Sequence, residues 1–144
     1  MKPRKSMRRI ASRAFPEVVL SNRALTKVVS REVARGHLRK IGPRLYTTNT
    51  TDAPADIVRR NLWVLLGQIV PGAIVGYRTA LEGTPGPDGH VYLTGSYDRT
   101  VRLPGHAVHI ARGPGPLAGD APFVGALHLA SRERALLESV AAAR

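Results

Sequence analysis

The segment from Asn22 to Tyr46 constrains the fold of this chain more than any other. Basic side chains recur every four residues over its first half, and apolar side chains with the same spacing lie between them. The basic set is Arg23, Lys27, Arg31 and Arg35, and the apolar set is Leu25, Val29 and Val33, with Val28 widening the apolar face. At about 100° per residue the two sets point in nearly opposite directions from a helix. The spacing predicts an amphipathic helix with one cationic face and one face that packs on a core.

Residues at both ends of this segment favour one continuous helix over residues 22–35. Ser21 is the expected N-cap, and Gly36 is the expected left-handed residue after the helix. No Gly or Pro interrupts the interval. The alternative is a helix-turn-helix in which a short helix over residues 22–27 precedes a recognition helix that begins at residue 28.

A basic hairpin is predicted directly after the helix. Residues 37–41 and 44–48 are extended in pattern and flank Gly42-Pro43, which is a turn dipeptide. A cationic helix followed by a basic hairpin is what a winged-helix DNA binder needs, with the helix in the major groove and the hairpin as a wing against the backbone or minor groove. A basic helix beside an ordinary hairpin is the alternative. The residues expected to contact DNA are Arg23, Lys27, Ser30, Arg31, Arg35, Arg39, Lys40 and Arg44.

Charge is concentrated in the first third of the chain. Residues 1–49 hold thirteen Lys or Arg and two acidic residues, a net charge of +11, whereas the other 95 residues hold nine basic and eight acidic residues, a net charge of +1. Such a segment attracts a polyanion, and nucleic acid fits better than a membrane because the apolar face is short and lacks Trp or Phe anchors. Duplex DNA is the expected partner and duplex RNA the alternative, since the few aromatic residues disfavour stacking on single strands.

The length of 144 residues allows one core with a small satellite module. A polar, turn-rich stretch over residues 47–54 separates two parts. We therefore predict an α+β protein in which residues 1–49 form a winged helix-turn-helix module with a basic N-terminal arm, and residues 50–144 form a small α/β domain. A short helix over residues 4–14 is the alternative to an arm without regular structure.

Helices are predicted in the second part over residues 55–69 and 131–143. Three extended segments with short turns between them favour an antiparallel meander. These segments cover residues 90–94, 100–103 and 106–111. The side chains of the last helix that we expect to face the core are those of Leu136, Leu137 and Val140.

Signals for catalysis or metal binding are weak. The chain has no cysteine, which excludes disulfides, thiolate metal sites and cysteine nucleophiles. His106 and His109 are three apart on a predicted strand and so point to opposite faces, which disfavours a shared metal. The prolines of the glycine-rich stretch over residues 113–120 remove amide donors, and no Lys-Ser/Thr follows it as in a phosphate-binding loop. We expect no enzyme activity, cofactor or metal; an enzyme that uses the histidine-bearing strands is the alternative.

The apolar runs of the chain are much shorter than a membrane span, and its basic N-terminus lacks the apolar region of a signal peptide. These features predict a soluble, cytoplasmic protein without a membrane partner.

With these residues in view, the chain resembles the N-terminal region of AbiEi-like antitoxins, the antitoxin half of type IV abortive-infection toxin–antitoxin systems. The resemblance spans residues 20–144. It rests on VVSREVARGHLRKIGPRLYTTN in the first part and on PGAIVGYRTALEG, VYLTG, VRLPGHAVHIARGPGPLAGD and LASRERALLES in the second. Very similar segments precede Fic adenylyltransferase domains, but the Fic sequence His-Pro-Phe followed by Gly-Asn-Gly and Arg does not occur here, so adenylylation is not carried over.

The resemblance implies promoter DNA binding and autoregulation through the basic helix and wing, and opposition to a nucleotidyltransferase toxin by a separate region. The expected function is therefore that of a DNA-binding transcriptional regulator of antitoxin type, acting on its own promoter. The alternative is a regulatory module that docks on a partner toxin or Fic-type enzyme, with DNA binding secondary. Reading two-fold half-sites in a promoter would require a homodimer.

Overall fold

The computed structural model describes residues 15–142, so the predicted N-terminal arm or helix lies outside the described residues. The described residues form five helices and two sheets, which confirms a mixed α+β protein. The chain divides into two compact units, Met1–Asn61 and Leu62–Arg144. This division falls later than the predicted boundary at residue 49, because the helix after the polar stretch belongs to the first unit. None of the helices within residues 15–142 has the length and apolar character needed to cross a membrane.

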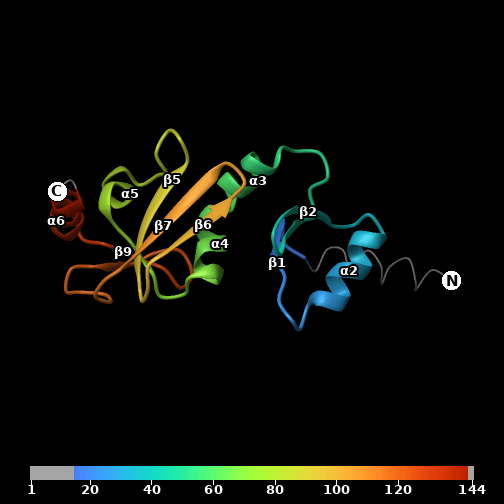
Figure 1. Cartoon of the computed structure of the whole chain (residues 1–144), viewed down its shortest axis with the longest axis horizontal. Coiled ribbons are helices and arrows are strands. Elements are labelled where there is room, and N and C mark those ends of the chain that lie inside the picture. The colour runs from blue at the N-terminus through green and yellow to red at the C-terminus, as the bar shows by residue number, and fades with distance from the viewer. Residues whose placement is uncertain (1–14, 143–144) are drawn as a thin grey trace. The chain divides into compact units, whose positions relative to one another are not determined.

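From residue 15 onward, the first unit contains a three-stranded antiparallel sheet and two helices (Figure 1). Its elements in chain order are β1 (Val18–Leu20), α2 (Thr26–Ala34), β2 (Arg39–Gly42), β3 (Leu45–Thr47) and α3 (Pro54–Arg60). The strand order is β1-β3-β2, and the predicted hairpin is confirmed as the antiparallel β2–β3 pair, although its turn is Pro43-Arg44 and not the predicted Gly42-Pro43. A cluster of Val19, Val29 and Leu38, with Phe15, Leu25 and Tyr46 packed against it, holds α2 to the sheet.

Residues 55–69 form two helices, so the single helix predicted there is wrong. α3 ends at Arg60 and α4 (Leu62–Ile69) begins two residues later, because Asn61 leaves the helical conformation with φ −114° and ψ 15°. The side-chain amide of Asn61 donates to the carbonyl oxygen of Ile57 at 2.8 Å and to Glu17 Oε1 at 2.7 Å. Asn side chains often bond to nearby backbone in place of a helical continuation, and Asn61 ends α3 in this way.

The second unit is built on a six-stranded mixed sheet of order β6-β7-β5-β4-β9-β8 (Figure 1). Its strands are β4 (Ile74–Val75), β5 (His90–Gly95), β6 (Arg99–Leu103), β7 (His106–Arg112), β8 (Ala121–Pro122) and β9 (His128–Leu129). Besides α4, its helices are α5 (Tyr77–Glu82) and α6 (Arg132–Ala142), which pack against each other, and α5 also packs on β5. Its most deeply buried side chains include Leu65, Leu66, Val91, Leu93 and Val108.

The antiparallel meander predicted over β5, β6 and β7 is wrong, although all three strands form. β6 and β7 make an antiparallel hairpin, but β5 pairs in parallel with β7 and not with β6. Val108 and Ile110 of β7 are buried, whereas Arg99 and Arg102 of β6 are exposed. The more apolar strand therefore takes the interior position with two neighbours, and the basic strand takes the edge, where charged side chains are common.

The inward face predicted for α6 is also wrong, because its apolar side chains are exposed. The exposed fractions are 46% for Leu136, 72% for Leu137 and 58% for Val140. The buried residues of the helix are Arg134 and Ala135.

Arg134 attaches the start of α6 to the loop that precedes it. Its Nη1 lies 2.6 Å from Asp120 Oδ2, and its guanidinium also donates to the carbonyl oxygens of Pro114 and Gly115. Burial opposes ionisation of Asp120, but hydrogen bonds from the amides of Leu117 and Ser131 and from Arg134 hold the pKa of its carboxyl below the ordinary value. This ion pair and the packing of Ala135 with Ile74 and Ala130, and not a leucine stripe, hold the start of the helix.

A substitution at Gly89 should destabilise the second unit. Gly89 has φ +80°, and a Cβ added there would overlap the carbonyl oxygen of Gly105, so backbone would have to move. We expect Gly89→Ala to lower the free energy of unfolding by about 2–4 kcal/mol. Urea denaturation followed by the fluorescence of Trp63, the single tryptophan of the chain, would measure it. Gly115→Ala is the matched control, since a Cβ added there would have no atom within 4 Å and no positive φ constrains the residue; an equal loss in both variants would contradict the argument.

Candidate nucleic-acid interface

Helix α2 presents a polar face to solvent and buries the opposite one. Lys27, Ser30 and Arg31 are exposed, whereas Val29 and Glu32 are buried. Two predicted core contacts are not made, because Val28 and Val33 are each 38% exposed. The cationic face is therefore present, on a helix whose buried face is narrower than the sequence pattern predicts.

The helix begins at Thr26, four residues later than predicted at residue 22, so Arg23 lies in the turn before it. Asn22 organises this turn: its Oδ1 accepts the amide of Leu25 at 3.0 Å, and its carbonyl oxygen accepts the Thr26 hydroxyl at 2.8 Å. Ser21 is not the N-cap; it is buried, and its amide donates to the Arg44 carbonyl oxygen at 2.7 Å. Only one stretch of α-helix occurs between β1 and β2.

The end of α2 follows the prediction, with one feature that the sequence pattern did not reveal. Gly36 has φ +78°, as expected for the left-handed residue after a helix. Glu32 is only 4% exposed, and its carboxylate lies 2.7 Å from His37 Nδ1 and 3.4 Å from Arg35 Nη1. Part of the positive charge of Arg35 is therefore offset by a buried acid on the same helix.

The turn of the β2–β3 hairpin carries a second group of exposed cations. Lys40 on β2 and Arg44 in the turn are both exposed. Arg44 has φ +59°, which is uncommon for a residue other than glycine, and its Nε donates to the Ser21 carbonyl oxygen at 3.2 Å. Together with the Ser21 amide bond, this contact fixes the hairpin turn against the segment that leads into α2.

Arg39 differs from the other predicted contacts because its side chain is committed within the unit. Its Nη2 donates to the carbonyl oxygens of Asn49 at 2.9 Å and Asp52 at 2.7 Å. Its Nε is buried without a hydrogen-bond partner among the described residues. We therefore leave Arg39 out of the candidate interface.

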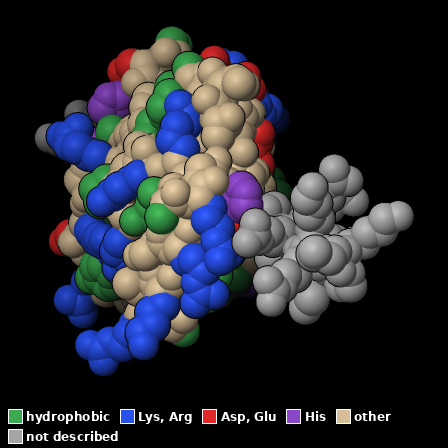
Figure 2. Space-filling view, turned by 90° about the vertical axis from the view of Figure 1, so that its right-hand side faces the viewer, with side chains coloured by type: hydrophobic (Ala, Val, Ile, Leu, Met, Phe, Trp, Pro, Cys, Tyr) green, Lys and Arg blue, Asp and Glu red, His purple; other side chains and the backbone are tan. Residues whose placement is uncertain are grey.

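The remaining exposed cations form the candidate interface. They are Arg23, Lys27, Arg31, Lys40 and Arg44, with Ser30 between them on α2 and Arg35 at its end. On the face of the molecule shown in Figure 2, Lys and Arg side chains gather in several patches, and acidic side chains are confined to its margins. Such a field attracts a polyanion.

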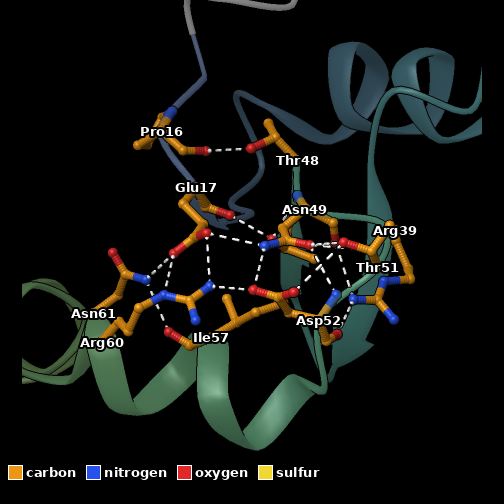
Figure 3. A network of polar contacts seen from close by, with 11 residues as sticks. Pro16, Glu17, Arg39, Thr48, Asn49, Thr51, Asp52, Ile57, Arg60 and Asn61 are labelled. Atoms are coloured by element: carbon orange, nitrogen blue, oxygen red, sulfur yellow. Dashed lines mark hydrogen bonds and ion pairs between the residues drawn. The ribbon is translucent and has the colours of Figure 1, made fainter.

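A network of hydrogen bonds and ion pairs centred on Glu17 connects the segment that leads into β1 with the residues after the hairpin and with α3 (Figure 3). Glu17 Oε2 accepts Arg60 Nη2 at 2.9 Å and Asn49 Nδ2 at 3.2 Å, and Asp52 Oδ2 also accepts Arg60 Nη2 at 2.9 Å. The carbonyl oxygen of Glu17 accepts the Thr47 hydroxyl at 2.6 Å. This network joins the start of β1, the end of β3 and α3, and no motif in the sequence indicated it.

The network shifts the titration of its members. Hydrogen bonds from Arg60, Asn61 and Asn49 lower the pKa of Glu17 from 4.5 to about 2. Hydrogen bonds from Asn49 and Arg60 lower the pKa of Asp52, and the two carboxylates in turn raise the pKa of Arg60. Glu17 and Asp52 are therefore ionised at neutral pH.

The histidines give no support to a metal centre. Among residues 15–142, no group of three or more His, Cys, Asp or Glu side chains could hold a metal ion. His109 contacts His90, whereas His106 Nδ1 lies 3.0 Å from the Pro104 carbonyl oxygen.

No protein-family model, curated protein or solved structure matches this chain.

The Glu17 network should make the stability of the first unit depend on pH. Because the folded-state pKa of Glu17 is depressed, its contribution is complete above pH 4.5 and is lost as the pH falls toward 2. We expect Glu17→Gln to lower the free energy of unfolding at pH 7 by about 1–3 kcal/mol. The difference in the free energy of unfolding between the variant and wild type should shrink as the pH falls from 4.5 toward 2. Amide hydrogen exchange at Ser21 and Thr48, whose amides donate to the carbonyl oxygens of Arg44 and Glu17, would report it, because Trp63 lies in the other unit.

The matched control for Glu17→Gln is Asp56→Asn. Asp56 forms an exposed ion pair with Arg59 at 3.1 Å on α3, which should contribute little. Equal effects of the two substitutions, or a Glu17→Gln effect that does not change with pH, would contradict the assignment.

Proposed function

We propose that this protein is a DNA-binding transcriptional regulator of antitoxin type, whose first unit binds duplex DNA as a winged-helix module. The observation that carries the proposal is the grouping of five exposed cations on one short helix, on the turn before it and on the hairpin after it. The sequence resemblance to AbiEi-like antitoxins, which rests in part on the same residues, agrees with this function.

The dimensions of the unit suit this role. α2 has nine residues, enough for two and a half turns, and an α-helix about 10–12 Å across fits a major groove about 12 Å wide. Lys27, Ser30 and Arg31 would face the base edges and the adjacent phosphates. Lys40 and Arg44 would contact the backbone from the hairpin, which serves as the wing.

Docking on a partner protein is the second candidate function, and the exposed leucines of α6 favour it. Leu136 and Leu137 present apolar surface on a helix of the second unit, as a docking site for a toxin or Fic-type enzyme would. Co-expression with the product of the neighbouring gene tests it. Failure of the two proteins to co-purify, with no change in the partner's activity, would count against it.

Binding to DNA should depend steeply on salt. If the five cations each neutralise a phosphate, log K should fall with log [salt] with a slope of roughly −4 to −5. We expect Lys27→Ala/Arg31→Ala to reduce the magnitude of this slope by about 2. Fluorescence anisotropy with the upstream promoter fragment and with a scrambled duplex, each over a salt series, measures both the slope and the preference for the promoter.

Arg59→Ala, on α3, is the matched control because it removes an exposed cation from outside the candidate interface. It should leave the slope nearly unchanged. A wild-type slope near zero would refute DNA binding. Equal affinity for the promoter and the scrambled duplex would contradict sequence-specific recognition of the promoter.

Substitutions of Arg39 and of its neighbour Lys40 should have opposite effects: the first should lower stability, and the second should weaken the salt dependence of DNA binding. Arg39→Met removes buried donors from two carbonyl oxygens, so we expect the free energy of unfolding to fall by about 1–3 kcal/mol without a change in the salt slope. Lys40→Met should leave stability within about 0.5 kcal/mol and reduce the slope by about 1. Denaturation measures the free energy of unfolding of the two variants, and fluorescence anisotropy measures the salt slope of their DNA binding. If folded Arg39→Met protein has a reduced slope, Arg39 contacts DNA and belongs to the interface.

A further inference from the structure

A cavity of about 500 Å³ opens on the second unit and is not explained by DNA binding. This volume lies within the range of about 300–1,000 Å³ typical of small-molecule sites. The polar and aromatic side chains that line it come from α5, β5, the β5–β6 turn, β7 and α6. They are Tyr77, Arg78, Tyr92, Asp98, His109 and Ser139.

Aromatic rings form one wall of the cavity. The parallel register of β5 and β7 pairs Tyr92 with His109, and their ring centroids lie 5.1 Å apart with an interplanar angle of 22°. The ring of Tyr77 lies 6.2 Å from that of Tyr92 at 51°. Flat π surfaces of this kind bind planar rings.

A pair of imidazoles fixes a hydrogen-bond acceptor on this wall. His90 Nδ1 and His109 Nε2 are 2.7 Å apart, and the planes of the two rings differ by 8°, so a hydrogen bond joins the rings. Asp88 Oδ2 lies 3.5 Å from His90 Nε2 and favours a proton on that nitrogen. We therefore assign the shared proton to His109 Nε2, so that His90 Nδ1 accepts it and His109 Nδ1 keeps a lone pair for a donor.

Tyr77 is held in a costly backbone conformation beside the cavity. Its φ of +56° is unusual for a bulky residue, and such outliers gather at functional sites. The Glu138 carboxylate accepts the Tyr77 amide at 3.4 Å and the Thr94 hydroxyl at 3.1 Å. At the preceding Gly76, a Cβ would lie only 2.7 Å from Glu138 Oε1. Burial and the charge of Glu138 both raise the pKa of Tyr77, so its ring stays neutral.

The cavity also offers one cation and one anion. Arg78 is 56% exposed in its side chain and lies 3.9 Å from Glu82 Oε1, a surface pair weak enough to yield to a bound anion. Asp98 Oδ1 accepts the Arg112 amide at 2.8 Å, and its carboxylate can accept from a donor on a ligand ring.

We propose that this cavity binds a planar heteroaromatic molecule that carries both a hydrogen-bond donor on its ring and an anionic group, the chemistry of a nucleoside monophosphate. The ring stacks on Tyr92 and His109 beside Tyr77, its donor contacts His109 Nδ1 or Asp98, and its anionic group pairs with Arg78. The site belongs to the second unit and does not depend on DNA binding by the first.

Titration of the full chain with AMP, followed by NMR of backbone amides, tests the site. We expect saturable chemical-shift changes of the Tyr77, Tyr92 and His109 amides with AMP at up to about 5 mM, which is above an expected dissociation constant of roughly 1 mM. Adenosine and ribose 5-phosphate separate the contributions of the ring and the anion, and each should bind at least about tenfold more weakly. No saturable shift at these residues with AMP, or equal binding of AMP and either fragment, would overturn the proposal.

Arg78→Gln provides the sharper test, because Arg78 is exposed and its loss should leave the fold intact. It should reduce the ratio of AMP to adenosine affinity to about one, whereas Arg99→Gln, on the edge strand, should keep the wild-type ratio. Tyr92→Ala should abolish the shifts at Tyr77 and His109, while Tyr97→Ala, an exposed tyrosine outside the cavity wall, should keep them. A ratio that Arg78→Gln leaves unchanged would overturn the proposal.

The Lys27→Ala/Arg31→Ala variant separates this site from the DNA interface. It should lose salt-dependent DNA binding and still show the AMP shifts of the second unit. AMP shifts that disappear with these two cations would place the nucleotide on the basic helix and refute the cavity site.

Discussion

The first unit depends on one ionised carboxylate, that of Glu17. Its side chain binds Arg60, Asn61 and Asn49, and its carbonyl oxygen accepts the Thr47 hydroxyl. A single residue at the start of β1 thereby connects the end of the hairpin with α3. A carboxylate that accepts several hydrogen bonds stays charged over a wide pH range, so the connection is both strong and directional. The hydrophobic cluster of Val19, Val29 and Leu38 holds α2 to the same sheet.

The same unit divides its cations into two groups with different roles. Arg39 and Arg60 contact carbonyl oxygens and carboxylates, so their charges stabilise the fold. Lys27, Arg31 and Lys40 face solvent, where their charges create a positive potential that attracts a polyanion. Not every cation of the described part of the first unit is therefore available for binding.

Backbone strain occurs at both candidate sites. Among residues 15–142, the non-glycine residues with positive φ are Arg44, at the turn of the hairpin, and Tyr77, beside the cavity. Each is held by neighbours from elsewhere in the chain: Arg44 through Ser21, and Tyr77 through Glu138. Strain of this kind persists only where surrounding contacts determine the conformation, and here it sets the direction of a cation and of an aromatic ring.

The sequence by itself determined many of the elements: the amphipathic helix, its end at Gly36, the hairpin after it and the strands β5, β6 and β7 follow from local periodicity and turn residues. Only the tertiary structure decided their partners. β5 pairs with β7 because the apolar strand is buried and the basic strand stays at the edge. Arg39 turns inward toward Asp52, and His90 meets His109, although in each pair the residues lie more than ten positions apart. Local pattern fixes backbone conformation within a few residues, whereas these contacts depend on which distant groups share one buried environment.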